Sequence, residues 1–256
     1  MSGACNAVLA AEKTGLRGRV VTCGSIFGMV GSASEKGFDH VYDAGDVNGY
    51  NTPGGCAYAY SKKEAQQQSM ALANERGVDM VTLNVGQVCG PALSPEQDNP
   101  SWEPFRLLTK KQPGGAVLSS CVPGMVDVRD VVKDHVAALG LLTGGAYARR
   151  YVVAAQKASP TYVEVYQLMA EILPDRNLPT HIETLPPNVQ KLVAKGISMG
   201  DKSLGELVAG VSVPPGGETV LVDVDPMLRD LVPSPRPLKQ TLADWVENQV
   251  AYGHAV

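Results

Sequence analysis

Two strand-like segments separated by one long helical segment constrain this chain more than any other feature. Residues 19–23 form an apolar, β-branched run, and residues 78–85 (VDMVTLNV) form a second one. Between them, residues 57–76 are the clearest helical segment in the chain, and the helix is expected to end at Gly77. A strand, a helix and a strand in this order predict a parallel sheet with a right-handed crossover. The predicted fold class is therefore α/β.

The rest of the chain adds helices, short strands and long loops. Residues 3–15 predict a helix that ends at Gly15. The stretch from Gly31 to Gly55 contains too many glycines to form one regular element. Further elements are predicted, in chain order, as helices at 102–111 and 126–144, a strand at 151–156, a helix at 161–173, helical pieces at 188–196 and 202–210, a strand at 219–224 and a helix at 241–253. Asp127 or Asp130 is expected at the start of the second of these helices.

Composition narrows the possible partners and compartments. The net charge of -4 and the sequence pI near 5.6 provide no basic surface, so nucleic acid is not expected as a partner. No apolar stretch approaches the roughly 18 residues of a membrane span. The five cysteines are odd in number, widely spaced and without metal-ligand spacing, which predicts free thiols, no metal site and a cytoplasmic location. Cys23 and Cys89 are expected to be buried and unreactive.

The glycines at 24, 28 and 31 suggest a dinucleotide-binding loop, and Asp43 lies about where a ribose-binding acid would stand. That fingerprint requires a long helix directly after the glycine loop, because the pyrophosphate is bound at the helix N-terminus. The residues after Gly31 do not form such a helix, and the glycine spacing is also wrong. The serine among these glycines, Ser25, is therefore the better candidate for function.

A functional role for Ser25 is supported by a tyrosine and a lysine that follow it in the chain. Tyr58 and Lys62 lie four residues apart on the helical segment, so both face the same side of the helix. A phenol has an ordinary pKa near ~10, and a cation one turn away stabilises its phenolate and makes it a better acid–base group at neutral pH. A serine at the neighbouring strand end can bind the same substrate oxygen. Either residue pattern alone is also typical of ordinary surface and turn residues.

Four segments, in this order, resemble one family. They are RVVTCGSIFGMVG, YAYSKKEAQQQSMALANERGVDMVTLNVGQVCGP, VDVRDVVKDHVAAL and LRDLVPSPRPLKQTLADWVENQ. The chain is similar to the extended short-chain dehydrogenases/reductases of the NAD-dependent epimerase/dehydratase superfamily. The branch it resembles contains dihydroflavonol reductases, cinnamoyl-CoA reductases and fungal carbonyl or methylglyoxal reductases. The resemblance covers residues 3 to about 172 and the C-terminal helix.

The resemblance implies a catalytic set and a cofactor wall. Ser25 would polarise a carbonyl oxygen, Tyr58 would protonate it, and Lys62 would support the tyrosine and hold the nicotinamide ribose. The matching cofactor-binding residues are Lys62, Asn84, Val85, Gly86, Gln87 and Val88. The implied cofactor is NADP(H) or NAD(H), with NADP(H) favoured. Asp127 and Arg129 match a motif that we interpret as structural, a helix cap with a salt bridge.

The resemblance also implies a division of the chain. Residues 1–90 would form the C-terminal half of a Rossmann-type domain, a partial parallel sheet that lacks the first strands of the family. Residues 91–256 would form mainly a smaller α+β substrate lobe, with about 117–156 returning to the sheet. The strand at 19–23 would then be an open sheet edge, covered by a partner or a second copy. The glycine fingerprint has no counterpart, so we expect this chain alone to bind NADP(H) weakly or not at all.

Three functions remain open at this stage. The first is an NAD(P)H-dependent reductase of a small aldehyde or ketone, in the form of a fragment or truncated gene product. The second is a non-catalytic relative that acts as a binding module. The third is a sugar-nucleotide epimerase or dehydratase, which the stretch HVYDAGDVN disfavours because it resembles the reductase branch. Trp102, Phe105 and Met29 could line a substrate pocket or belong to a hydrophobic core.

Overall fold

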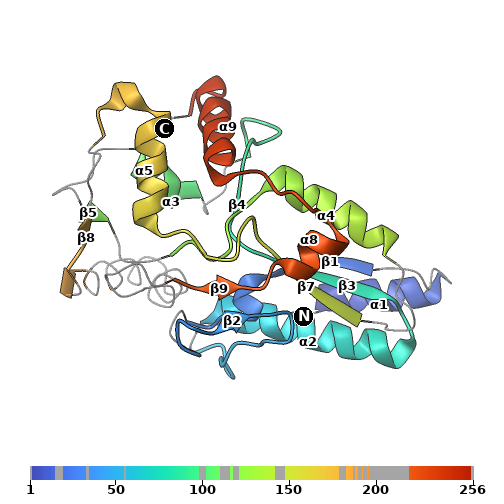
Figure 1. The fold of residues 1–256 in the computed structure, drawn as a ribbon. Coiled ribbons are helices and arrows are strands. Elements are labelled where there is room, and N and C mark those ends of the chain that lie inside the picture. Colours follow the sequence, from blue (N-terminus) through green and yellow to red (C-terminus); the bar gives the residue numbers. More distant parts are fainter. Residues whose placement is uncertain are drawn as a thin grey trace.

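A computed structural model describes residues 2–14, 20–32, 35–54, 56–97, 102–109, 116–117, 121–141, 148–178, 183–186, 188–189, 192, 195 and 219–254. Its centre is a three-stranded parallel sheet in the order β1-β3-β7 (Figure 1), formed by Val20–Ser25, Met80–Val85 and Ala148–Val153. The strands are in register, so Ser25 pairs with Val85, and Val85 pairs with Val153. This arrangement confirms the predicted α/β class with parallel strands.

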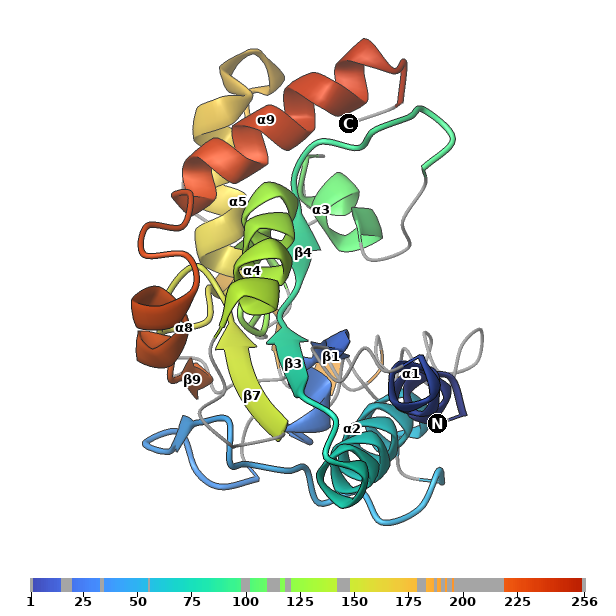
Figure 2. The ribbon, with the colours of Figure 1, turned by 90° about the vertical axis from the view of Figure 1, so that its right-hand side faces the viewer.

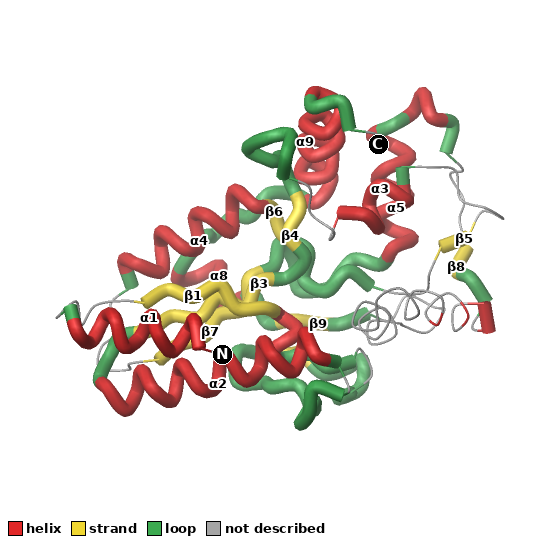
Figure 3. Tube along the Cα trace, turned by 180° about the vertical axis from the view of Figure 1, so that it is seen from behind, coloured by secondary structure: helices red, strands yellow, loops and turns green. Residues whose placement is uncertain are grey.

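Helices cover both faces of the sheet. Helices α1 (Ser2–Lys13) and α2 (Ala57–Arg76) lie on one face, and α4 (Val128–Gly140) lies on the other (Figures 2 and 3). Successive side chains of β3 point to opposite faces of the sheet. Met80 packs with Val8 of α1 and Ala73 of α2, whereas Leu83 lies in the core on the α4 side. The strand is therefore buried on both faces, as expected for a parallel strand between helices.

Helix α2 begins and ends where the sequence predicts. It closes at Gly77, whose φ of 64° is in the left-handed region that favours glycine. Helix α1 ends at Lys13, and the predicted cap at Gly15 lies outside the described residues. The two helices pack against each other and against the sheet (Figure 3).

A second hydrophobic core lies between α3 (Glu103–Leu108), α5 (Tyr162–Ile172) and α9 (Leu238–Ala251). Phe105 and Trp102 both contact Trp245 edge-on, with ring centroids 6.1 and 6.3 Å apart. These two aromatic residues therefore belong to this core, and Met29 belongs to the core of the sheet. Figure 1 shows the three helices gathered at one end of the molecule, away from α1 and α2. A domain boundary near residue 90 stays a prediction.

The remaining elements are short. They are the 3-10 turns η1 (Ile26–Gly28) and η4 (Pro174–Arg176), the parallel pairs β2 (Val41–Tyr42) with β9 (Leu221–Val222), β4 (Val88–Cys89) with β6 (Val126–Asp127), and β5 (Ala116–Val117) with β8 (Glu183–Thr184), and helix α8 (Asp225–Asp230). The strand predicted at 219–224 is thus only two residues long. The helical piece predicted at 202–210 lies outside the described residues. No helix in the described part of the chain is long and apolar enough to cross a membrane.

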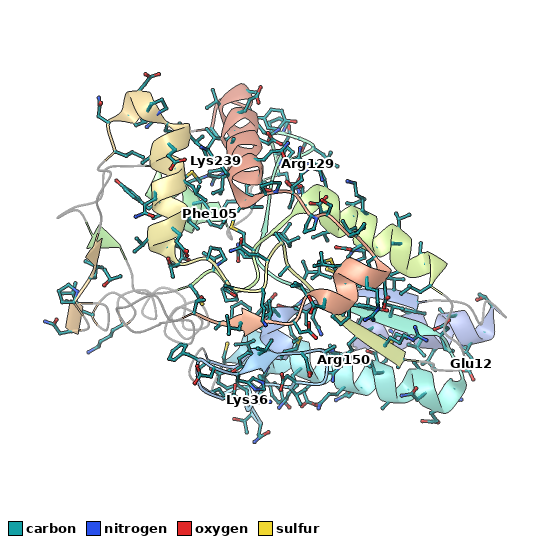
Figure 4. The ribbon with its side chains drawn as sticks, in the orientation of Figure 1. Glu12, Lys36, Phe105, Arg129, Arg150 and Lys239 are labelled. Carbon is teal, nitrogen blue, oxygen red and sulfur yellow. The ribbon has the colours of Figure 1, made fainter. Side chains whose placement is uncertain are left out.

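Helix α4 is tied to α9 through its first turn. Asp127 caps α4 by accepting a hydrogen bond from the backbone N–H of Arg129 at 2.8 Å, and its carboxylate also accepts from the guanidinium. The same guanidinium, of the residue labelled Arg129 in Figure 4, donates to Asp244 of α9 at 2.6 Å, and the Thr241 hydroxyl donates to Asp127 at 2.9 Å. The interpretation of Asp127 and Arg129 as a structural cap and ion pair agrees with these contacts.

Candidate active site

The carboxyl ends of β1 and β3 bring the serine to the edge of the sheet where loops follow. Ser25 is the last residue of β1, and its side chain caps η1 by accepting a hydrogen bond from the backbone N–H of Phe27 at 3.2 Å. Its oxygen is used as an acceptor, so its proton is available to donate to a ligand. In open parallel sheets ligands bind beyond the carboxyl ends of the strands, which is where this hydroxyl lies.

Tyr58 and Lys62 lie on the first two turns of α2. The Tyr58 side chain is 39% exposed, and its ring meets Phe27 edge-on with centroids 6.1 Å apart. The Lys62 ammonium lies 5.4 Å from the centroid of the Tyr58 ring. The structure therefore brings the tyrosine, the lysine and the turn after Ser25 together. Within the described residues, no hydrogen bond joins the Ser25 and Tyr58 hydroxyls.

Asn84 occupies a different position from the one a direct cofactor ligand needs. Its side chain is fully buried, and neither amide atom has a hydrogen-bond partner among the described residues. It leans over Gly24, where an added Cβ would lie 2.7 Å from its Oδ1. The Asn84 side chain therefore fills the space that a side chain at position 24 would need. Any contact of Asn84 with a cofactor would come from its backbone.

The segment after Asn84 is held by backbone contacts. Gly86 donates to the Val153 carbonyl at 3.0 Å, and Gln87 donates to the Pro123 carbonyl at 3.0 Å. A Cβ on Gly86 would lie 1.7 Å from the carbonyl oxygen of Gly124, so only glycine fits there. Val85 is buried in the sheet core, and Val88 begins β4. These contacts fix the path of the predicted cofactor wall against the end of β7.

Sequence reasoning missed two residues at this place. Gly124 has a φ of 56° and packs against Gly86, and the Pro123–Gly124 pair is the turn signal that could have indicated it. Asn48 is almost fully buried inside the stretch that was interpreted only as a glycine-rich loop. A lone asparagine in such a stretch has no sequence signal that separates it from a turn residue.

The expectation for the two cysteines near the site is half right. Cys89 is buried, and burial raises the pKa of its thiol, so it stays a neutral thiol. Cys23 is exposed, which corrects the prediction, because β1 pairs with β3 alone among the described strands. Cys23 lies beside His135 of α4, and this contact, more than the backbone carbonyl of Val131, raises the pKa of the imidazole.

The hydrogen-bonding groups at this edge fit the nicotinamide end of a dinucleotide, but the described residues provide no site for its pyrophosphate. The Tyr58 hydroxyl, the Lys62 ammonium and the backbone of 84–88 could hold a nicotinamide and its ribose. In the described residues β1 continues into the three-residue turn η1, and this turn is too short to provide the helix N-terminus that binds a pyrophosphate. No group of three His, Cys, Asp or Glu side chains in the same residues could hold a metal ion.

Comparison with known proteins shows what part of this sequence is similar to. The sequence is 32% identical to cinnamoyl-CoA reductase 1 of Arabidopsis thaliana over 123 residues, which is 48% of this chain and 33% of that protein. It is 28% identical to cinnamoyl-CoA reductase CAD2 of Medicago truncatula over 122 residues, 48% of this chain and 35% of that protein. The chain thus matches about a third of the length of these curated relatives. No protein-family profile matches it.

The fold is similar to that of other solved proteins over nearly the whole chain. Gre2 from Candida albicans superimposes with a TM-score of 0.70 at 20% identity, over 98% of this chain and 70% of that one. Vestitone reductase from alfalfa (Medicago sativa) superimposes with a TM-score of 0.66 at 18% identity, over 98% and 71%. At 20% identity or less, these superpositions show a shared fold.

Proposed function

We propose that this chain is part of an extended short-chain dehydrogenase/reductase, an NAD(P)H-dependent reductase of small aldehydes or ketones. The observation that carries the proposal is the convergence of Ser25, Tyr58 and Lys62 at one edge of the sheet. The Phe27 ring beside Tyr58 and the Lys62 ammonium over the same ring support this convergence. The sequence similarity to cinnamoyl-CoA reductases points in the same direction.

Each residue has one role in this reaction. A bound nicotinamide supplies the hydride that reduces the carbonyl carbon. Ser25 donates a hydrogen bond to the carbonyl oxygen and orients it, and the Tyr58 hydroxyl gives this oxygen its proton. The Lys62 ammonium stabilises the phenolate that remains on Tyr58. The backbone from Asn84 to Val88 would form the wall that holds a bound nicotinamide, with Val85 and Gly86 at its centre.

The finer assignments belong to the same proposal. The cofactor is NADPH in preference to NADH, since Gre2 of Candida albicans was crystallised in complex with NADPH. The substrate is a small carbonyl compound, because the Tyr58 hydroxyl, as proton donor, and the Ser25 hydroxyl can both bind one carbonyl oxygen. The cytoplasm is the proposed compartment, since the cysteines are free thiols in the described structure. The open edge of β1 is proposed to be covered by a partner or a second copy.

The test compares two tyrosine variants of the full chain. Oxidation of NADPH and NADH is followed at saturating cofactor with a panel of aldehydes and ketones. Tyr58→Phe is expected to lower kcat by at least about 100-fold, because general acid catalysis contributes that much, while its circular dichroism spectrum stays unchanged. Tyr60→Phe is the matched control, since Tyr60 lies on the same helix with the Lys63 ammonium 5.7 Å from its ring centroid.

The outcomes separate the open functions. If Tyr58→Phe and Tyr60→Phe turn over equally fast, Tyr58 is not the proton donor. If the unchanged chain binds a cofactor in a direct titration but oxidises neither cofactor with any carbonyl compound, the reductase proposal fails and the binding-module alternative takes its place.

A further inference from the structure

Asn48 makes more polar contacts than a loop residue needs. Its side chain is 4% exposed, in the loop between β2 and α2. Its amide Nδ2 donates to the Phe27 carbonyl at 2.6 Å and to the Ala59 carbonyl at 3.0 Å. An amide nitrogen carries two hydrogens, so both bonds form at the same time.

The other polar atoms of Asn48 are also used. Its Oδ1 accepts a hydrogen bond from the backbone N–H of Tyr50 at 3.0 Å, and its own backbone N–H donates to the Gly28 carbonyl at 3.2 Å. Because both neighbours of Nδ2 are carbonyl oxygens and the neighbour of Oδ1 is an N–H, the amide has only one satisfactory orientation. The side chain is therefore a fixed bridge between its neighbours.

The bridge joins the two segments that carry the proposed proton-transfer residues. Phe27 lies two residues after Ser25 in the turn η1, and Ala59 directly follows Tyr58 in the first turn of α2. We propose that Asn48 is a positioning residue that sets the distance between the Ser25 and Tyr58 hydroxyls. This inference rests on the proposed reductase function and extends it, because it names the residue that holds the two hydroxyls in reach of one carbonyl oxygen.

The loop has other tethers, which allow the role of the amide to be separated from loop folding. The Lys63 ammonium donates to the Tyr50 carbonyl, and the Tyr50 hydroxyl donates to the Gly31 carbonyl at 3.2 Å. The backbone bond from Asn48 to Gly28 also survives any side-chain substitution. Loss of the Asn48 amide should therefore leave the loop in place and loosen only the link between η1 and α2.

The experiment compares Asn48→Ala with Tyr50→Phe in the full chain, using NADPH and the best aldehyde of the panel. Asn48→Ala is expected to lower kcat by about 10- to 100-fold, because a misplacement of about 1 Å costs up to that factor. Its KM for NADPH should stay within about twofold, since the amide touches neither Lys62 nor the 84–88 wall. Tyr50→Phe removes a hydrogen bond of the same loop and should keep kcat within about twofold.

A second variant and a second measurement keep the inference testable. If Asn48→Ala does not fold, Asn48→Asp replaces it, because its carboxylate keeps the acceptor for Tyr50 but cannot donate to the two carbonyls. Equal kcat values for the Asn48 and Tyr50 variants, or a parallel rise in KM, would overturn the positioning role.

Hydrogen exchange separates this inference from the proposed function. In Asn48→Ala, amide exchange should accelerate in both 26–31 and 57–63, and in Tyr50→Phe it should not. If the unchanged chain binds NADPH but reduces no carbonyl compound, the proposed function fails. The hydrogen-exchange comparison then still tests whether Asn48 links η1 to α2. Faster exchange confined to residues 43–51 would show that Asn48 holds only its own loop.

Discussion

At the residue scale, the packing of Asn84 against Gly24 explains why a glycine stands within strand β1. The carboxamide of Asn84 occupies the space next to Gly24 that a side chain would need, and a Cβ would also meet Thr82 Cγ2 at 2.9 Å. The glycine is therefore required by its neighbour on β3, although a glycine within a strand ordinarily costs stability. The two positions are expected to change together.

Gly24→Ala should destabilise the protein by about 1–3 kcal/mol, because the added methyl overpacks the interface between strands. Asn84→Ala removes the atom that is nearest to this methyl, so the double variant should be more stable than the sum of the two single effects predicts. Urea unfolding of all four proteins measures this coupling. Gly3→Ala, at an open position on α1, is the control and should not destabilise. Strict additivity would show that the contact is not energetically important.

At the element scale, the first turn of α4 depends on one carboxylate. Asp127 is buried, and burial opposes its ionisation, but the hydrogen bonds from Arg129 and Thr241 outweigh burial and place its pKa below the ordinary value. The same carboxylate caps α4 and joins it to α9. The position of α4 over the sheet is thus coupled to the core of the three-helix end.

Asp127→Ala should cost about 3 kcal/mol or more, since it removes the cap and leaves the guanidinium without its buried partner. Asp244→Ala is the matched comparison, because Asp244 binds the same guanidinium from a side chain that is partly exposed, and it should cost less than about 1 kcal/mol. Thermal and urea unfolding provide both values. Similar losses for the two variants would mean that the cap contributes little.

At the scale of the whole molecule, one buried acid makes stability depend on pH. Burial, and then the nearby carboxylate of Asp130, raise the pKa of Asp134 to about 7. Both of its carboxylate oxygens are buried and have no hydrogen-bond partner among the described residues. The protonated side chain is therefore the form that the folded protein tolerates.

The sign of the pH effect follows from this shift. Between pH about 4 and about 7 the folded chain holds a proton that the unfolded chain has lost, so the free energy of unfolding falls as pH rises through this window, by up to about 4 kcal/mol. Asp134→Asn cannot ionise and should be more stable than the unchanged chain at pH 8, with little difference at pH 4. Urea unfolding at both pH values tests this, with the exposed Asp175→Asn as control. Parallel pH curves for the chain and Asp134→Asn would contradict the assignment.

Much of the fold could be predicted because its signals are local. The helix at 57–76 and its end at Gly77 depend on backbone preferences within a few residues, and they agree with the structure residue by residue. The strand at 78–85 was also recognised, since a run of apolar residues is read without knowing its neighbours. Strand β2 was not predicted and β9 was predicted too long, because these two-residue strands exist only through a partner 180 residues away.

The sequence by itself determined the α/β class, the parallel strand order around α2 and the candidate set of Ser25, Tyr58 and Lys62. Only the tertiary structure showed that the Asn84 side chain is buried over Gly24 and that Asn48 bridges two segments. It also showed that the backbone of Gly124 lies too close to Gly86 for any residue but glycine. Each of these depends on atoms brought together from distant parts of the chain. Periodicity and motif spacing describe a segment and its near neighbours, whereas steric fit and hydrogen-bond satisfaction are properties of the packed molecule.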